Sequence, residues 1–299
     1  MRNILFFLTL LSATHTYGQG DGPRAYWPAP KGTDIMSSLY LHVNSNSAFD
    51  NTFFVKDAEF DTDMFGLMYT RVFDVAGHTA AVVAMISGGS LSGGIDNIYT
   101  GETSGLADTY VIGVFNLTGA PSVTVEEYMK TNYDVVIDVI AAFRAPTGSY
   151  EADRNLNIGT NRWEFKFGFP MMKFFNWGTP KVTSIELFPS ISFFTNNNDL
   201  ADPNASLSQS ALFNIEGHVT RKLSKLFWAS LDYQYRYGGR TSIEEVKNDN
   251  LINSLSLGGS VGADFNPKFG AYITYGGVVL NNENGLDGNL LKLICSFKF

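Results

Sequence analysis

Apolar and polar residues alternate in long runs through most of this chain, and this alternation is the feature that most limits its fold. In the run 227–237 the odd positions are apolar or aromatic, and Asp232 and Arg236 are among the even ones. The runs 133–143 and 162–169 follow the same pattern. Side chains that change face at every residue predict β-strands. After residue 18, no stretch of about 18 apolar residues predicts a membrane-spanning helix.

Twelve strand-like segments are expected, with clusters of Gly, Asn, Asp and Pro between them. They are residues 35–44, 62–75, 78–88, 106–116, 133–143, 161–171, 180–195, 207–221, 225–237, 251–265, 268–280 and 289–299. Several connectors after even-numbered segments are tight, such as Ala76-Gly77, whereas those after odd-numbered segments are long and polar. Bacterial outer-membrane barrels have an even number of antiparallel strands, joined alternately by short periplasmic turns and long extracellular loops.

Two features depart from this simple scheme. Residues 117–132 form a long connector on the side where short turns are expected, and residues 125–130 within it could form a short helical turn. Pro170 and Pro189 fall inside predicted strands. Because proline cannot donate a hydrogen bond to the ladder, each of them indicates a strand end or a bulge.

The composition favours a membrane-embedded barrel. Charged residues make up 17% of the chain, against about 25% in ordinary globular proteins. The chain contains 24 Phe, 14 Tyr and 29 Gly, and aromatic residues form girdles at the two membrane interfaces of such barrels. Aromatic residues near the expected strand ends are Tyr69, Tyr110, Tyr133, Trp163, Trp177, Trp228, Tyr237 and Tyr272. We therefore expect an all-β fold, an antiparallel transmembrane β-barrel; the alternative is an exported β-sandwich with an aromatic core.

The chain divides into three segments. Residues 1–18 have a basic start, an apolar centre and small or polar residues at the end, which is typical of a secretory signal peptide. Residues 19–33 form a short N-terminal arm, and residues 34–299 form the barrel. The single cysteine, Cys295, cannot form an intramolecular disulfide, so the exported fold does not need one. These features predict a protein of the bacterial outer membrane, in contact with its lipid.

Phe299 ends the chain on an alternating last strand. A terminal aromatic in this position looks like the signal that the barrel assembly machinery reads. We therefore expect Phe299 to act in assembly, with that machinery as a partner.

Neither nucleic-acid binding nor catalysis is expected. The formal net charge is −8 and no Lys/Arg run is present, although phosphate binding needs clustered cations. The mature chain has three isolated histidines, His42, His78 and His218, and no nucleophile, phosphate-binding or metal-ligand motif. We predict no catalytic residue, no metal site and no cofactor.

Charged residues of inward parity are expected to line the lumen. They are Asp134, Asp138, Arg144, Arg162, Glu164, Lys166, Glu216, Asp232, Arg236 and Asp264, with His218 beside Glu216. Twelve strands leave a bore between the filled eight-stranded and the open sixteen-stranded barrels. Charges across such a bore could orient polar solutes, or they could pair fully and close it.

The N-terminal arm is a second candidate site. Tyr26, Trp27 and Pro28 form an aromatic, stiff segment that is followed by Lys31 and shows no alternation. We expect this arm to lie against the periplasmic mouth or inside the lumen as a partial gate. The alternative is an untethered linker.

Four stretches of the chain resemble the outer-membrane transporter family named "MetA-pathway of phenol degradation". They are residues 24–33 (RAYWPAPKGT), 119–121 (GAP), 145–163 (APTGSYEADRNLNIGTNRW) and 237–241 (YGGRT), and the third is the most specific. The family often has Gly-Leu-Gly-Asp where this chain has Gly105-Leu106-Ala107-Asp108. The resemblance implies a porin-like barrel that passes small organic molecules, especially aromatic hydrocarbons.

The sequence thus leads to two functional hypotheses. The first is an outer-membrane channel for passive uptake of small organic solutes, aromatic or hydrophobic ones among them. The second is a non-conducting barrel that serves as a structural element or a surface adhesin. An open barrel needs unpaired polar positions along a continuous path, whereas a closed one pairs them all.

Overall fold

The structure is a computed structural model that describes residues 20–47, 58–95, 98–283 and 285–299. The predicted signal peptide, residues 1–18, and the first residue of the predicted arm lie outside these ranges. Within the described part of the chain, no helix is long and apolar enough to cross a bilayer.

Nearly all regular structure is β-strand. The first strands are β1 (Asp34–Ser45), β2 (Ala58–Val75), β3 (His78–Ile95), β4 (Tyr99–Leu106), β5 (Thr109–Thr118), β6 (Val135–Ala145), β7 (Glu164–Gly168), β8 (Met171–Phe175) and β9 (Thr183–Phe194). The remaining strands are β10 (Leu207–Gln209), β11 (Leu212–Lys222), β12 (Phe227–Gly238), β13 (Thr241–Ile243), β14 (Val246–Lys247), β15 (Ile252–Asp264), β16 (Phe269–Asn281) and β17 (Gly288–Lys298). One short helix, α1 (Val125–Tyr128), lies between β5 and β6.

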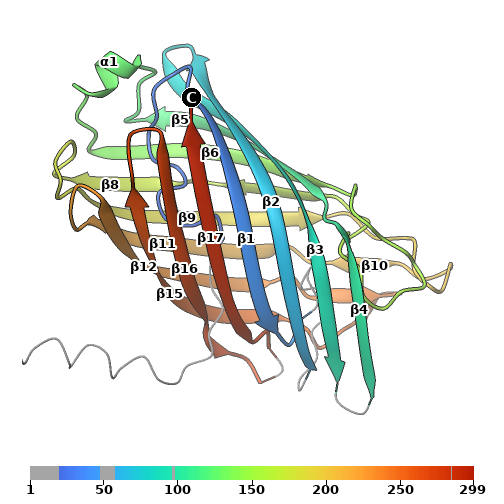
Figure 1. Cartoon of the computed structure of the whole chain (residues 1–299). Helices are drawn as coiled ribbons and strands as arrows, with labels where there is room; N and C mark the ends of the chain where they lie inside the picture. The colour runs from blue at the N-terminus through green and yellow to red at the C-terminus, as the bar shows by residue number, and fades with distance from the viewer. Residues whose placement is uncertain (1–19, 48–57, 96–97, 284) are drawn as a thin grey trace, which may run out of the picture.

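The main sheet closes into an antiparallel barrel of twelve strands, as the sequence predicts. β4 and β5 pair with successive parts of β3, so together they form one barrel strand. β7 and β8 pair with successive parts of β9 and likewise form one barrel strand. The first strand β1 pairs with the last strand β17 from Ile35↔Lys298 to Ser45↔Gly288, and this pairing closes the barrel. Figure 1 shows β17 and β1 side by side.

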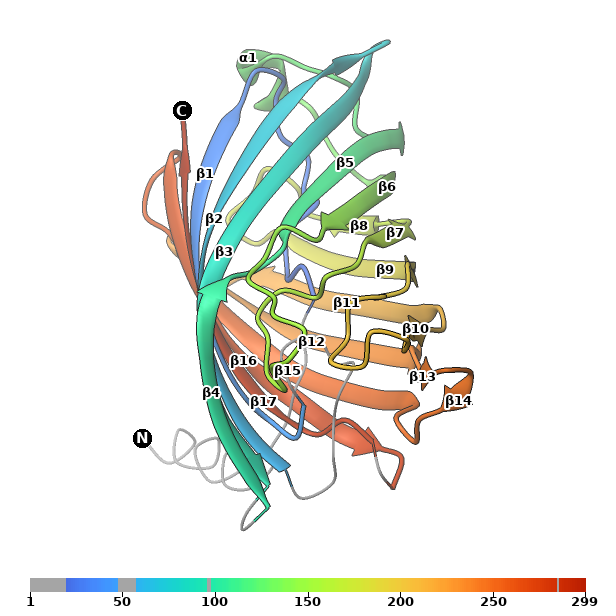
Figure 2. The same cartoon turned by 90° about the vertical axis from the view of Figure 1, so that its right-hand side faces the viewer.

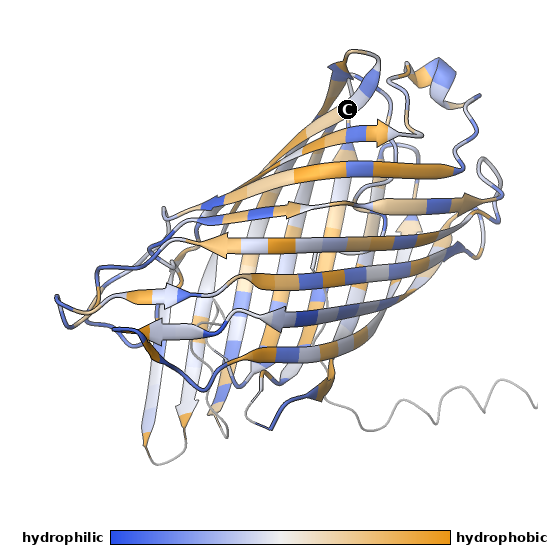
Figure 3. Cartoon of the chain, turned by 180° about the vertical axis from the view of Figure 1, so that it is seen from behind, coloured by the Kyte–Doolittle hydropathy of each residue, from blue (hydrophilic) through white to orange (hydrophobic). Residues whose placement is uncertain are grey.

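The alternation in the sequence separates the lipid-facing wall from the interior. Leu231 is 74% exposed, whereas its neighbour Asp232 is 3% exposed. Along the strands seen from behind, hydrophilic and hydrophobic residues alternate (Figure 3). Exposed apolar side chains on the outside and buried polar ones inside are the reverse of a soluble protein, which excludes the sandwich with an aromatic core.

The two ends of the barrel differ, as the connector lengths predict. The barrel part of the chain starts and finishes on the side with the short turns. There the backbones of Asp34 and Phe299 exchange hydrogen bonds of 3.2 and 2.9 Å. We call this end periplasmic. The turn at Ala76-Gly77 has both residues at positive φ, 51° and 84°, as a tight hairpin requires.

The helical turn expected at 125–130 is present as α1 at the periplasmic end (Figure 1). Thr124 begins it with a capping box, because Glu127 N donates to Thr124 Oγ1 at 3.3 Å and Thr124 N donates to Glu127 Oε2 at 2.7 Å. Thr124 Oγ1 also donates to Glu127 Oε2 at 2.9 Å, and the backbone and side-chain hydrogen bonds from Thr124 lower the pKa of this exposed carboxyl from its ordinary value.

The strand predictions were wrong at the extracellular hairpin between β3 and β4. Residues 89–105 were expected to be a loop, but β3 continues to Ile95 and β4 begins at Tyr99. This hairpin is rich in glycine and polar residues on both faces, so it lacks the alternation that marks the membrane part of a strand. A small separate sheet of β10, β13 and β14 was also not predicted. Residues 207–209 were expected to begin the barrel strand 207–221, but as β10 they pair with β13 outside the barrel sheet.

Pro170 and Pro189 share a single irregularity, as their sequence positions indicate. Pro170 lies between β7 and β8, and across from this break the carbonyl of Pro189 accepts from Phe169 N at 3.0 Å. Asp138 N donates to the carbonyl of Pro170 at 2.8 Å. The two missing donors therefore fall at the same interruption of the ladder.

The expectation that the end-of-strand aromatics form girdles was only half right. Tyr69, Trp163 and Tyr237 are exposed on the wall, but Tyr133 and Trp228 are buried. Trp228 has the parity of the buried residues of β12, and Gly262 opposite it leaves room for the indole, since a Cβ on Gly262 would lie 2.2 Å from the Trp228 ring.

Closure at the C-terminus generates a prediction about assembly. Phe299→Ala keeps the backbone bonds to Asp34 and removes only the exposed ring that stacks on Phe297, with ring centroids 6.2 Å apart. If the ring is the assembly signal, this variant should lower the amount of heat-modifiable barrel in outer-membrane fractions. Phe299→Tyr, which retains an aromatic terminus, should assemble normally; normal assembly of Phe299→Ala would remove the proposed role of the ring.

Candidate functional site inside the barrel

The described part of the N-terminal arm, residues 20–33, enters the barrel interior instead of extending away from it. Figure 2 shows its blue trace inside the barrel, between β5 and β11. Its polar groups contact side chains of β7, β9, β11 and β17. The arm is therefore tethered, and the alternative of an untethered linker was wrong for these residues.

Glu216 of β11 is the central acceptor for the arm. Its carboxylate is 1% exposed and accepts Gly22 N on Oε1 at 2.8 Å and Asp21 N on Oε2 at 3.1 Å. His218 holds it in place, with Nε2 at 2.9 Å from Glu216 Oε1 and Nδ1 at 2.6 Å from Asp232 Oδ1. Because carboxylates only accept, both imidazole nitrogens act as donors in this geometry.

Glu186 of β9 binds the next part of the arm. Its Oε2 accepts Arg24 N at 3.0 Å, and its Oε1 accepts the indole Nε1–H of Trp27 at 2.9 Å. Ser184 and Thr220 donate to the same Oε1 from the wall at 2.6 and 3.3 Å. Two buried carboxylates thus hold four donors of the arm.

Cations of the wall bind the acceptors of the arm. Lys292 Nζ donates to the carbonyl of Gly20 at 3.2 Å, and Lys166 Nζ lies 3.4 Å from Asp21 Oδ2. Arg24 in turn pairs with Asp264 at 3.1 Å, which also lies 3.0 Å from Lys222 Nζ. The arm therefore compensates buried charges of both signs, which would be costly without partners.

Gly22 fits closely against this wall. Its φ of +96° lies in the region that favours glycine, and a Cβ there would lie 2.9 Å from Lys292 Nζ and 3.1 Å from the Tyr272 hydroxyl. Gly22, two residues before the stretch RAYWP, thus lets the backbone of the arm approach Glu216.

Aromatic contacts anchor the arm at the periplasmic mouth. The Trp27 ring packs against Phe174 and Trp177 with centroids 5.3 and 5.7 Å apart, and Tyr26 packs edge-on against Phe188 at 5.2 Å. The Tyr128 hydroxyl of α1 donates to the carbonyl of Pro28 at 3.0 Å. Lys31 is exposed, but its backbone N donates to Val123 O at 2.9 Å.

Most of the other charged residues of the predicted lumen set are buried or half-buried. Asp138 is 5% exposed and accepts the amide of Asn116 at 2.6 Å. Arg144 and Glu164 form an ion pair at 3.1 Å, away from the arm. Arg162 is buried and lies over the Phe194 ring at 4.8 Å, and Arg236 is half-buried beside Gln234.

The prediction for Asp134 was wrong. Its side chain is 66% exposed and forms an ion pair with Lys173 at the periplasmic end of β6 and β8. β6 begins only at Val135, so the alternation that gives inward parity does not reach Asp134.

Four site residues were missed: Asp21, Arg24, Glu186 and Lys292. The parity of Glu186 with the buried Ser184 and Ser190 could have revealed it. Asp21 and Arg24 carry no periodic signal, because the arm has no regular structure. The wall partners of these two residues are between 145 and 240 residues away in the chain.

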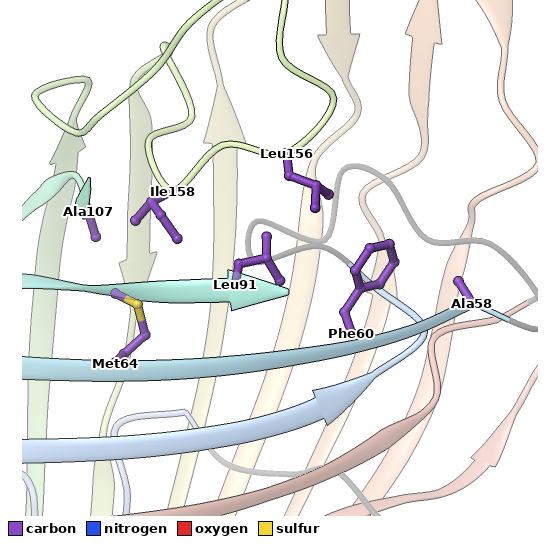
Figure 4. Packing of buried hydrophobic residues seen from close by; sticks show 7 residues of the cluster. All are labelled: Ala58, Phe60, Met64, Leu91, Ala107, Leu156 and Ile158. Atoms are coloured by element: carbon purple, nitrogen blue, oxygen red, sulfur yellow. The ribbon is translucent and has the colours of Figure 1, made fainter. Parts of the chain in front are cut away.

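The loop 146–163, the most specific part of the family resemblance, packs against the barrel at its extracellular end. Asp108 is buried and accepts Gly148 N at 2.9 Å, Thr160 N at 3.0 Å and Thr160 Oγ1 at 2.6 Å. Leu156 and Ile158 of this loop pack on the inner apolar residues of β2 and β3, as Figure 4 shows. The stretch from Gly148 to Thr160 thus folds against Asp108.

Two further observations describe the interior. Among the described residues, no group of three or more His, Cys, Asp or Glu side chains is arranged to hold a metal ion. A cavity of about 10 Å³ lies between the arm and the wall, lined in part by Gly22, Tyr26, Glu186 and Glu216, and it has room for about one water molecule.

Comparison with known families identifies the chain. The family described as "Putative MetA-pathway of phenol degradation" matches residues 44–291. The chain belongs to this family. No curated protein sequence matches it.

Solved structures share the fold. The crystal structure of an outer membrane channel from Pseudomonas putida F1 superposes with a TM-score of 0.78 at 20% identity, over 93% of this chain and 99% of the other. The transport unit of the autotransporter AIDA-I from Escherichia coli gives a TM-score of 0.52 at 9% identity, over 95% of this chain and 93% of that one. The β domain of the Bordetella autotransporter BrkA gives 0.51 at 8% identity, over 89% and 100%.

The closed barrel, its apolar wall and the family together place this protein in the bacterial outer membrane, as the sequence predicts. The role of each interior residue stays a prediction. Two substitutions test the contacts of the arm with Glu216 and of the extracellular loop with Asp108.

The first substitution tests the hold of Glu216 on the arm. Glu216→Ala removes two backbone hydrogen bonds to a buried carboxylate, each of the order of 1 kcal/mol or more. Trypsin should then cleave after Arg24 about tenfold faster or more, because the arm leaves the interior more often. Glu126→Gln, an exposed site on α1, is the matched control and should leave the cleavage rate unchanged; equal rates in both variants would show that Glu216 does not hold the arm.

The second substitution tests the extracellular loop. Asp108→Ala removes three hydrogen bonds that hold residues 148 and 160, so the loop should be cleaved faster by a protease that accepts Arg154. Asp153→Ala, on the exposed part of the same loop, serves as the control. Heat modifiability of the barrel should be unchanged in both variants, since neither substitution removes a pairing between the barrel strands.

Proposed function

We propose that this protein is an outer-membrane channel for passive uptake of small organic solutes, and that its N-terminal arm narrows the path. The observation that carries the proposal is the way the arm is held. Its contacts with the wall include hydrogen bonds and ion pairs to Glu186, Glu216, Asp264 and Lys292, together with two apolar clusters that hold Trp27 and Tyr26. Such contacts can be exchanged for solvent or solute, whereas a continuous apolar core could not be opened without unfolding.

The size of the barrel suits small solutes. Eight-stranded barrels are filled by their own side chains, and barrels of sixteen or more strands enclose wide aqueous channels. The twelve strands of this barrel lie between these limits, and the arm occupies part of the bore. Molecules of the size of one or two rings are the class that this geometry favours.

Aromatic side chains inside the barrel support aromatic or otherwise apolar solutes. Trp27, Phe174 and Trp177 surround the mouth, and Trp228 is buried beside Arg24, whose guanidinium lies 4.9 Å from its ring. The description of the family, with its link to phenol degradation, points in the same direction. In this proposal Tyr26, Trp27, Pro28 and Lys31 form the gate, and the charged wall residues orient the solute.

The second candidate function is a non-conducting barrel with a structural or adhesin-like role. The observation that favours it is the extent of charge pairing, because Glu216, Asp232, Asp264 and Lys166 all have oppositely charged partners. A barrel that is closed in this way would need no solute. A single measurement distinguishes this candidate from the channel.

That measurement is planar-bilayer conductance of the refolded mature chain and of a variant that lacks residues 19–33. A channel with an arm across its path should give steady single-channel currents that increase several-fold in the deletion variant. Blocking of the current by an aromatic solute would support the proposed solute class. A folded, heat-modifiable barrel without current in either form would favour the non-conducting candidate, and equal conductance of the two forms would contradict the gate.

A further inference from the structure

We propose that the contacts around the Trp27 side chain form a binding site for an aromatic molecule that carries one N–H or O–H donor, and that Trp27 is the intramolecular occupant of this site. The site consists of Phe174, Trp177 and Glu186, with Arg24 of the arm beside them. The proposal rests on the function proposed above, because it names the class of solute that the interior recognises.

The apolar part of the site suits a flat ring. Phe174 stands at 84° to the Trp27 ring, with centroids 5.3 Å apart, and Trp177 is tilted by 56° at 5.7 Å. The Phe174 and Trp177 rings contact each other at 4.8 Å, so they form a corner that exists without Trp27. Edge-to-face contacts of this kind favour aromatic over aliphatic occupants.

The polar part of the site requires a donor. Glu186 Oε1 accepts the indole Nε1–H at 2.9 Å, and the Glu186 carboxyl is buried, at 8% exposed. Ser184 and Thr220 point their hydroxyls at the same oxygen but cannot replace a donor that approaches from the lumen. An occupant without a donor therefore leaves a buried carboxylate with fewer hydrogen bonds, and an anionic occupant is repelled.

A cation completes the site. The Arg24 guanidinium lies 4.3 Å from the centroid of the Trp27 ring, and Asp264 holds it there at 3.1 Å. A cation over the face favours electron-rich rings, such as indoles and phenols, over electron-poor ones. Ring, donor and cation together select neutral, electron-rich aromatic molecules with one donor.

The site is accessible, and it can be emptied without losing the arm. Trp27 is half-buried, not enclosed. The arm is also held by Glu216 at Asp21 and Gly22, and by Asp264 at Arg24. A solute that takes the place of the indole therefore meets a site that the rest of the arm keeps in shape.

The test is to empty the site and refill it. Trp27→Ala removes the indole, and the purified barrel in detergent is titrated with indole and with 1-methylindole, which keeps the ring system but carries a methyl group in place of the N–H donor. We expect indole to raise the unfolding temperature of Trp27→Ala and to bind about tenfold more tightly than 1-methylindole, since only indole restores the hydrogen bond to Glu186. Wild-type protein should bind indole more weakly than the variant, because Trp27 competes.

The matched control is Glu186→Gln in the Trp27→Ala background. A neutral amide oxygen is a weaker acceptor than a carboxylate, so the preference for indole over 1-methylindole should shrink. Equal binding of the two ligands by Trp27→Ala itself would overturn the donor requirement. Absence of binding by a correctly folded Trp27→Ala would overturn the site.

A measurement on the wild-type chain keeps the proposal testable if the variant does not fold. Indole that displaces Trp27 removes one of the contacts that hold the arm, so it should accelerate trypsin cleavage after Arg24, although the contacts with Glu216 and Asp264 remain. 1-Methylindole should accelerate cleavage much less; equal rates with and without indole would contradict the site. Both assays measure binding in detergent and need no current. A barrel that binds indole but does not conduct would support this site and contradict the proposed channel. A conducting barrel that does not bind indole would support the channel and contradict this site.

Discussion

A backbone N–H or C=O group that faces hydrocarbon must find its partner within the protein, because the membrane offers none. In this chain the pairing of β1 with β17, from Ile35↔Lys298 to Ser45↔Gly288, meets that demand by leaving the sheet without an edge. Once the sheet is closed, each strand has one face toward lipid and one toward the interior. The outer face can then be apolar at almost every position, and the polar side chains are left to the interior.

That division creates a second demand, inside the barrel. Glu186, Glu216 and Lys292 are all at least nine-tenths buried, and charges at such positions need partners. The wall supplies some of them, such as His218 for Glu216. The arm supplies others through its backbone, which explains why a segment without regular structure or alternation has a defined place. The arm and the polar wall are therefore one structural unit.

The sequence predicted what depends on local periodicity. Alternation gave the number of barrel strands and the parity of Glu216, His218 and Asp232. The missing proline donor indicated the break at Pro170, between β7 and β8, which lies across from Pro189 of β9. Alternation failed where periodicity ends: Asp134 precedes the first residue of β6, and the β3–β4 hairpin is polar on both faces. The resemblance to the family located the arm and the loop at 145–163, but their contacts join residues too far apart in the chain for any local pattern to reveal.

The distance along the chain between the arm and its partners also bears on the order of assembly. Gly20 bonds to Lys292, which is 272 residues later, and Arg24 bonds to Asp264, which is 240 residues later. The arm is the first described part of the chain to be made, yet these partners belong to strands that are among the last. Its contacts with Asp264 and Lys292 can form only once β15 and β17 are part of the sheet, so the arm is not fully held until these strands have joined. Full seating of the N-terminal arm thus depends on the C-terminal strands of the barrel.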